Sequence, residues 1–132
     1  MNMNMKKSLK VLLVERKGTW QDILREKIGQ AMHQIGATNT LVIAETANEG
    51  LNTLSQNGWN LLITDIGLGS PQKPGAALVA RAHELKIPCL VVSGVANTQD
   101  INHFFSKYEI NGYFDKGSFD STKFIESVTE AL

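Results

Sequence analysis

The chain has 132 residues, of which 42% are hydrophobic and 20% charged, and its formal net charge is zero. These values are typical of one soluble globular domain and give no reason to expect electrostatic binding to nucleic acid or to an anionic membrane. No apolar stretch approaches the roughly 20 residues of a membrane-spanning helix, and the polar start lacks the apolar core of an export signal. The single cysteine, Cys89, excludes an intrachain disulfide and fits a reducing compartment.

Short apolar runs alternate with segments of helical periodicity along the chain. A flexible tail is expected at residues 1–9, ahead of a single domain at 10–132. The apolar runs, which predict strands, lie at 11–14, 41–44, 61–63, 89–92 and 112–114. Apolar residues that recur every three or four positions predict helices at about 20–35, 47–57, 75–85, 98–108 and 121–131.

Capping residues and inward-facing side chains support these helices. Thr19 is expected to cap the first helix, and Thr46 opens the second with the spacing of a capping box. In the third helix Leu85 is expected to face the core. In the fourth, the neighbouring Phe104 and Phe105 both fall within the predicted apolar stripe, so both are expected to be buried.

Five strand–helix units predict an α/β fold with an open, doubly wound parallel sheet. The strands are apolar throughout, as strands covered on both faces should be, and right-handed crossovers then give three layers. Five units are too few for a closed eight-stranded barrel. The strand order 2-1-3-4-5 is therefore expected. One irregular connection, 67–75, carries three glycines and two prolines and is predicted to be a loop.

Polar side chains follow four of the predicted strands. Glu15 and Arg16 follow the first, Asp65 the third and Ser93 the fourth, and Lys116 comes just after the fifth. In open parallel sheets, ligands bind beyond the carboxyl ends of the strands. We therefore expect Glu15, Asp65, Ser93 and Lys116 to share one cleft that suits chemistry on an anionic group, with phosphate as the first candidate.

The order of these residues resembles that of response-regulator receiver domains, and the resemblance covers the chain from Lys10 onward. It implies that Asp65 accepts a phosphoryl group, that Ser93 donates a hydrogen bond to it and that Lys116 pairs with one of its oxygens. Tyr113, three residues before the lysine, matches an aromatic residue that often acts as a rotamer switch together with the strand-four hydroxyl.

Two departures from the family pattern accompany these matches. The family usually has two adjacent acids after the first strand, which hold a magnesium ion, whereas this chain has Glu15 followed by Arg16. The family also has a proline after the lysine, where this chain has Gly117. In addition, the loop after Asp65 looks longer than usual.

The arginine changes the expected charge of the site. Glu15 and Asp65 face Arg16 and Lys116, which balance to zero without a metal. Magnesium prefers oxygen ligands in an octahedron, so at most Glu15, Asp65 and the carbonyl of Gly67 remain as protein ligands, and weak magnesium binding is expected. The sequence leaves open whether Arg16 points into the site, where its fork can bridge carboxylates, or out to solvent.

The resemblance implies a cytoplasmic receiver in a two-component phosphorelay, a signalling protein and not an enzyme. Asp65 would take its phosphoryl group from a histidine kinase or phosphotransfer protein. The strand-four and strand-five face would then signal to a downstream protein partner. The last predicted helix ends near Leu132, so no effector domain is expected to follow it.

Two alternatives remain open at this point. The first is a degenerate receiver that acts as a protein-interaction module without phosphorylation. The second is a small flavin- or nucleotide-binding protein with the same sheet order. That reading requires a phosphate-cradling loop after the first strand, and residues 15–19 offer only one glycine.

Overall fold

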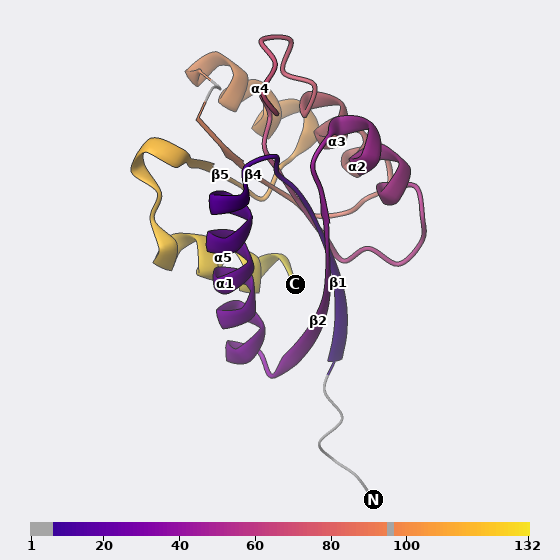
Figure 1. The fold of residues 1–132 in the computed structure, drawn as a ribbon, viewed down its shortest axis with the longest axis vertical. Coiled ribbons are helices and arrows are strands. Elements are labelled where there is room, and N and C mark those ends of the chain that lie inside the picture. Colours follow the sequence, from indigo (N-terminus) through magenta and orange to yellow (C-terminus); the bar gives the residue numbers. More distant parts are fainter. Residues whose placement is uncertain (1–6, 95–96) are drawn as a thin grey trace, which may run out of the picture.

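The five apolar runs form one parallel sheet, and helices cover both of its faces (Figure 1). The computed structural model describes residues 7–94 and 97–132. Its elements in chain order are β1 (Lys7–Val14), α1 (Gly18–Gln34), β2 (Ala37–Ala44), α2 (Ala47–Leu54), β3 (Leu61–Thr64), α3 (Ala76–Glu84), β4 (Cys89–Ser93), α4 (Thr98–Tyr108), β5 (Gly112–Asp115), a short 3-10 helix (Lys116–Ser118) and α5 (Ser121–Ala131). The strand order is β2-β1-β3-β4-β5. The predicted three-layer, doubly wound fold is confirmed.

Each face of the sheet packs against its own set of helices. In β1, Val11 and Leu13 belong to the core under α1 and α5, while Leu12 and Val14 belong to the core under α2, α3 and α4. All four side chains are fully buried. Successive residues of a strand point to opposite faces, so a strand covered on both sides must be apolar at every position. This explains why the strands read as continuous apolar runs.

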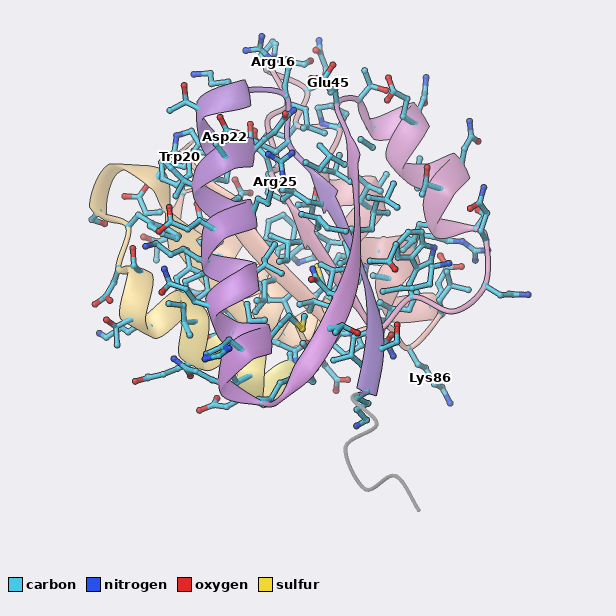
Figure 2. The ribbon with its side chains drawn as sticks, turned by 60° about the horizontal axis from the view of Figure 1, so that its bottom comes forward. Arg16, Trp20, Asp22, Arg25, Glu45 and Lys86 are labelled. Atoms are coloured by element: carbon cyan, nitrogen blue, oxygen red, sulfur yellow. The ribbon has the colours of Figure 1, made fainter. Side chains whose placement is uncertain are left out.

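The parallel arrangement places all carboxyl ends of the strands at one edge. In Figure 2, Arg16 and Glu45, which follow β1 and β2, lie at one end of the molecule, and Lys86, which precedes β4, lies near the other. Since β1 lies between β2 and β3, the residues that follow β1 and β3 are neighbours at the point where the strand order reverses.

Two predicted chain boundaries were wrong. The sheet already begins at Lys7, because Lys7–Leu9 pair with Ala37–Asn39 of β2; residues 1–6 of the predicted tail lie outside the described residues. Helix α1 begins at Gly18, one residue before Thr19, so its cap position is Lys17 and no side chain caps it.

The capping prediction for α2 is confirmed. The Thr46 hydroxyl oxygen accepts a hydrogen bond of 3.1 Å from the backbone N–H of Glu49. The helix ends at Leu54, three residues before the predicted end.

Two residues predicted to face the core are exposed. The exposed fraction of Leu85 is 38%, because it lies at the C-cap position of α3, beyond the last helical turn. That of Phe105 is 42%, whereas its neighbour Phe104 is buried. Adjacent helical residues point about 100° apart, and α4 buries only a narrow stripe. Cys89 is buried as expected, and desolvation raises the pKa of its thiol to about 12.

In the described part of the chain, no helix combines the length and the apolar character needed to cross a membrane.

Candidate functional site

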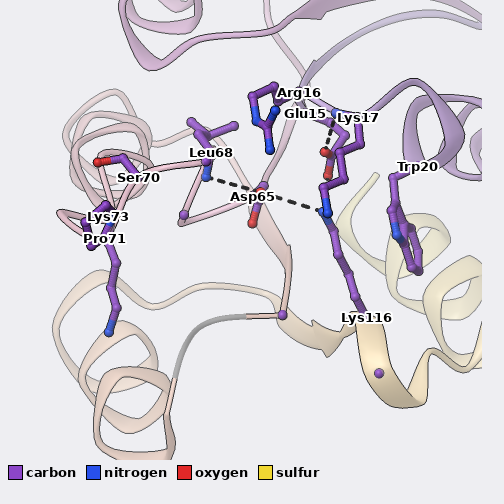
Figure 3. A pocket seen from close by; sticks show the side chains of 14 residues that line it. Glu15, Arg16, Lys17, Trp20, Asp65, Leu68, Ser70, Pro71, Lys73 and Lys116 are labelled. Carbon is purple, nitrogen blue, oxygen red and sulfur yellow. Dashed lines mark hydrogen bonds and ion pairs between the residues drawn. The ribbon is translucent and has the colours of Figure 1, made fainter.

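An ion-pair cluster joins the ends of three strands. The Lys116 ammonium, just after β5, lies 2.6 Å from Glu15 Oε1 and 3.6 Å from Asp65 Oδ2 (Figure 3). These residues are distant in sequence and meet because β1, β3 and β5 run parallel. The structure thus brings together three of the residues expected to share a cleft.

Glu15 is a buried carboxylate with a fixed orientation. Its exposed fraction is 1%, and its Oε2 accepts a 2.9 Å hydrogen bond from the backbone N–H of Lys17. Burying a charge is costly unless an opposite charge compensates it, and Lys116 supplies that charge. The Lys116 ammonium, 2.6 Å away, is the cationic partner of Oε1.

Lys116 is held by an aromatic ring as well as by the two carboxylates. Its Nζ lies 5.4 Å from the centroid of the Trp20 ring, a distance at which a cation is attracted to the ring face. Trp20 in turn packs edge-on against Phe119, with centroids 5.2 Å apart. Trp20 belongs to the first turn of α1 and packs against the core on that face of the sheet. Its role as a wall of the cleft depends on the chain after β5, which no local pattern reveals.

The Asp65 side chain is held at the start of the loop that follows β3. Its backbone N–H donates to the Val14 carbonyl at 3.0 Å, which extends the β1–β3 pairing by one residue. Its Oδ2 accepts a hydrogen bond of 3.3 Å from the N–H of Leu68. Leu68 has a φ of 47°, a left-handed conformation that costs free energy in a residue with a side chain. The loop therefore stores some strain directly beside the carboxylate.

Gly75 closes this loop behind Asp65. Its N–H donates to the Ile66 carbonyl at 2.8 Å, and a Cβ at this position would lie 2.7 Å from the Ile66 Cα and closer still to the Asp65 carbonyl oxygen. Only glycine fits against this backbone. The sequence pattern indicated a loop here, but not this close approach.

Arg16 lies over the same loop rather than away from it. A Cβ on Gly69 would come within 2.6 Å of the Arg16 Nε, so the arginine occupies the space that the missing side chain leaves. Figure 3 shows its guanidinium on the Asp65 side of the cleft. The side chain remains exposed, and no hydrogen bond or ion pair of Arg16 occurs within the described residues. Arg16 therefore lines the cavity but bridges neither carboxylate, and its role in the site stays a prediction.

Together these side chains line a cavity of about 620 Å³. Its walls carry two carboxylates, Glu15 and Asp65, and more cationic side chains than those two can balance. The cationic side chains are Arg16, Lys17, Lys73 and Lys116. An excess of positive charge favours an anionic ligand.

The fold resembles those of known signalling domains. No protein-family model matches the sequence, and no curated protein matches it. The signal receiver domain of an HD domain-containing protein from Pseudomonas fluorescens Pf-5 matches with a TM-score of 0.74 and 23% identity, over 96% of this chain and 95% of that one. The non-phosphorylated HemR receiver domain from Leptospira biflexa matches with 0.74 and 19%, over 93% of each chain. A CheY-like response regulator receiver domain protein from Methanospirillum hungatei JF-1 matches with 0.68 and 25%, over 96% and 93%. The chain has the receiver-domain fold.

Within the receiver fold, Ser93 and Tyr113 are directly connected. Ser93 ends β4 and is fully buried, while the next residue, Gly94, lines the cavity. The Tyr113 hydroxyl donates to the Ser93 carbonyl at 3.3 Å. Tyr113 is half-buried and packs on the α2–α4 side of the sheet. The Tyr113 ring is therefore turned toward Ser93 of β4, the residue with which it would act as a rotamer switch.

Gly117 has a structural consequence of its own. Its N–H donates to Asp115 Oδ1 at 3.3 Å, and this bond caps the 3-10 helix after β5. Proline, which the receiver pattern has here, lacks the N–H. The glycine thus allows a capping hydrogen bond that proline could not donate, at the start of the 3-10 helix that contains Lys116.

The donor set fits magnesium poorly. In receiver domains an acidic pair holds the ion, but here Arg16 replaces one acid and Lys116 contacts the other, Glu15. The Gly67 carbonyl, the third expected ligand, already accepts the N–H of Ser70 at 2.9 Å. The described residues contain no group of three or more acidic, histidine or cysteine side chains able to hold a metal.

A second ion pair ties the loop that follows Asp65 to α4. Lys73, whose φ is 52°, places its Nζ 2.7 Å from Asp100 Oδ2. Asp100 is the third helical residue of α4 and forms a capping box with Asn97. The hydrogen bond from Lys73 is the largest of several causes that lower the pKa of Asp100. This contact joins the loop beside the cleft to the helix next to β4 and β5.

Replacing Gly75 by alanine should destabilise the protein by about 1–3 kcal/mol or more, because the methyl group overlaps backbone atoms of the Asp65 loop. Gly29→Ala is the matched control. Gly29 lies inside α1, and an added Cβ would meet nothing within 4 Å outside the helix's own backbone, so the substitution should stabilise by about 0.5–1 kcal/mol. Urea unfolding measures both free energies, and equal midpoints for the two variants would contradict the packing argument.

Replacing Lys73 by methionine should raise the pKa of Asp100 toward its ordinary value, measured by NMR titration of the carboxyl group. A lowered pKa in the folded state stabilises the fold at neutral pH, and this contribution is lost as the pH falls through the folded pKa. The variant should therefore lose less stability on acidification than the unmodified protein. Arg81→Met, which removes an exposed helix pair with Glu84, should leave the Asp100 titration unchanged. An unshifted Asp100 in Lys73→Met would show that the pair does not form in solution.

Proposed function

We propose that this chain is a response-regulator receiver in which Asp65 accepts a phosphoryl group from a histidine kinase or phosphotransfer protein. The observation that carries the proposal is the Lys116 ammonium, 2.6 Å from Glu15 and 3.6 Å from Asp65 at the switch point of a receiver fold. A carboxylate and an ammonium at this separation suit the transfer of an anionic group.

The proposed reaction moves one phosphoryl group between proteins. A carboxylate oxygen of Asp65 attacks the phosphorus of a phosphohistidine, the O–P bond forms, the N–P bond breaks, and the imidazole leaves with the bonding electron pair. Lys116 pairs with a phosphoryl oxygen and offsets the charge that transfer adds. The Ser93 hydroxyl donates a hydrogen bond to another phosphoryl oxygen. This requires a local movement, because the Ser93 side chain is buried in the unmodified protein.

Output from the site is proposed to reach a downstream protein partner through the β4 and β5 face. The contact between Tyr113 and the Ser93 carbonyl supports this route, because it connects the fifth strand to the end of the fourth. We assign the protein a signalling role in the cytoplasm, with no enzymatic, nucleic-acid or membrane function of its own.

A second candidate function is that of a receiver that binds partners without being phosphorylated. The altered acidic pair favours it, because Arg16 replaces a magnesium ligand that the phosphorylation chemistry of receiver domains ordinarily uses. Both candidates require the same fold and differ in whether Asp65 is modified.

Asp65→Asn should abolish phosphorylation. The unmodified protein, incubated with acetyl phosphate or a phosphorylated histidine kinase, should gain the mass of one phosphoryl group in intact-mass analysis, and the variant should gain none. Asp22→Asn, which changes an exposed carboxylate on α1, should label as the unmodified protein does. Full labelling of Asp65→Asn would exclude Asp65 as the acceptor, and no labelling of the unmodified protein by any donor would favour the phosphorylation-independent module.

Magnesium should bind weakly to the unmodified protein and more tightly to Arg16→Asp. The substitution removes a positive charge and adds an oxygen ligand beside Glu15 and Asp65. The magnesium affinity should therefore rise at least roughly tenfold, which is the usual effect of changing a residue around a metal site. Amide NMR shifts during magnesium titration measure it. Arg25→Asp makes the same charge change on α1, outside the residues that line the cavity, and should have little effect. Tight binding by the unmodified protein with no gain in Arg16→Asp would contradict this prediction.

A further inference from the structure

We infer that Arg16, seated over Gly69, makes the cleft a binding site for a phosphate-type tetrahedral oxyanion that needs no divalent cation. The inference rests on the proposed function where the oxyanion is a phosphoryl group on Asp65, and it extends to free phosphate in the unmodified protein. Arg16 is then the residue that binds the oxygens which a metal ion would otherwise hold.

The position of Arg16 is the first reason. Its Nε lies where a Gly69 side chain would be, and its Cζ and Cδ would also lie within 3.3 Å of a Cβ there. Gly69 has a φ of 78°, which favours glycine independently of the arginine. The absent side chain at Gly69 therefore leaves space that the Arg16 side chain fills, and both residues line the cavity (Figure 3).

The distribution of charges is the second reason. Lys116 already contacts both carboxylates of the cavity, and Lys73 is paired with Asp100. Within the described residues, Arg16 has no carboxylate within ion-pair distance. Its charge is therefore not used to hold the fold together and remains available to an incoming anion.

The chemistry of the side chain is the third reason. A guanidinium donates two parallel hydrogen bonds to two oxygens of one phosphate, which an ammonium cannot do. Arg16 is exposed, so folding does not strip its guanidinium of water and an anion can reach it from solvent. Lys116, whose side chain is 14% exposed, lines the same cavity and supplies a second, more buried cation. An oxyanion bound in this cavity would therefore have two cationic side chains available to it.

Free phosphate in magnesium-free buffer at constant ionic strength tests the site directly. The indole N–H signal of Trp20, which lines the cavity, should shift on titration. The indole N–H signal of Trp59, which lies before the amino-terminal end of β3, should not shift. Arg16→Ala should weaken phosphate binding about tenfold or more, the loss expected for charge-assisted hydrogen bonds, and Arg16→Lys should lie between. Arg25→Ala removes an arginine from α1 outside the cavity lining and should bind as the unmodified protein does.

Gly69→Asn supplies a second variant in which the arginine is kept but displaced. Asparagine tolerates positive φ better than most residues, yet its Cβ would come within 2.6 Å of the Arg16 Nε. Phosphate affinity should fall as in Arg16→Ala. Unchanged amide spectra away from the loop establish that each variant is folded.

Beryllofluoride binds an aspartate oxygen and mimics a phosphoryl group. It therefore distinguishes an anion attached to Asp65 from free phosphate in the cavity. The unmodified protein should take it up without magnesium, Arg16→Ala should not, and Asp65→Asn should lose beryllofluoride but keep phosphate. If Asp65 takes neither beryllofluoride nor a phosphoryl group while phosphate binding still depends on Arg16, the inference stands and the proposed phosphotransfer fails. If the unmodified protein binds neither anion without magnesium, or Arg16→Ala behaves like Arg25→Ala, the inference is overturned.

Discussion

The buried ion pair between Glu15 and Lys116 is the constraint on which the rest of the site depends. A carboxylate that is 1% exposed is unfavourable without a compensating charge, so the chain after β5 must bring its ammonium to the end of β1. Asp65 follows the strand next to β1, and the same ammonium lies 3.6 Å from its carboxylate. One cation therefore contacts two carboxylates that follow different strands. Removing it would leave Glu15 buried and uncompensated, which costs more than the pair contributes when both partners are present.

Much of the fold and part of the site could be predicted from the sequence, because the relevant signals are local. Strands covered on both faces must be apolar at every position, and polar residues at the ends of such runs must lie at one edge of the sheet. These two rules suffice to bring Glu15, Asp65 and Lys116 together. The same kind of local signal identified Thr46 as the cap of α2.

The remaining features depend on contacts between segments that are far apart in sequence. Gly75 looks like any loop glycine until the loop folds back on the Ile66 backbone. The pair between Lys73 and Asp100 spans 27 residues, and neither residue carries a motif. The exposure of Phe105 depends on how α4 is rotated against the sheet, and neighbouring aromatic residues in a helix do not reveal which of them faces the core.

On our proposal, Arg16 changes the physical basis of the site while the fold persists. A metal ion neutralises phosphoryl oxygens only while it is bound, so its contribution depends on its concentration and on a full set of oxygen ligands. A cation attached to the chain after β1 is always present at the site, although it cannot bridge oxygens in octahedral geometry. Its place over the loop uses the space that a side chain at residue 69 would fill, which Gly69 leaves empty. We therefore interpret Arg16, Gly69 and the incomplete acidic pair as one arrangement, in which the chain itself supplies the positive charge near Asp65.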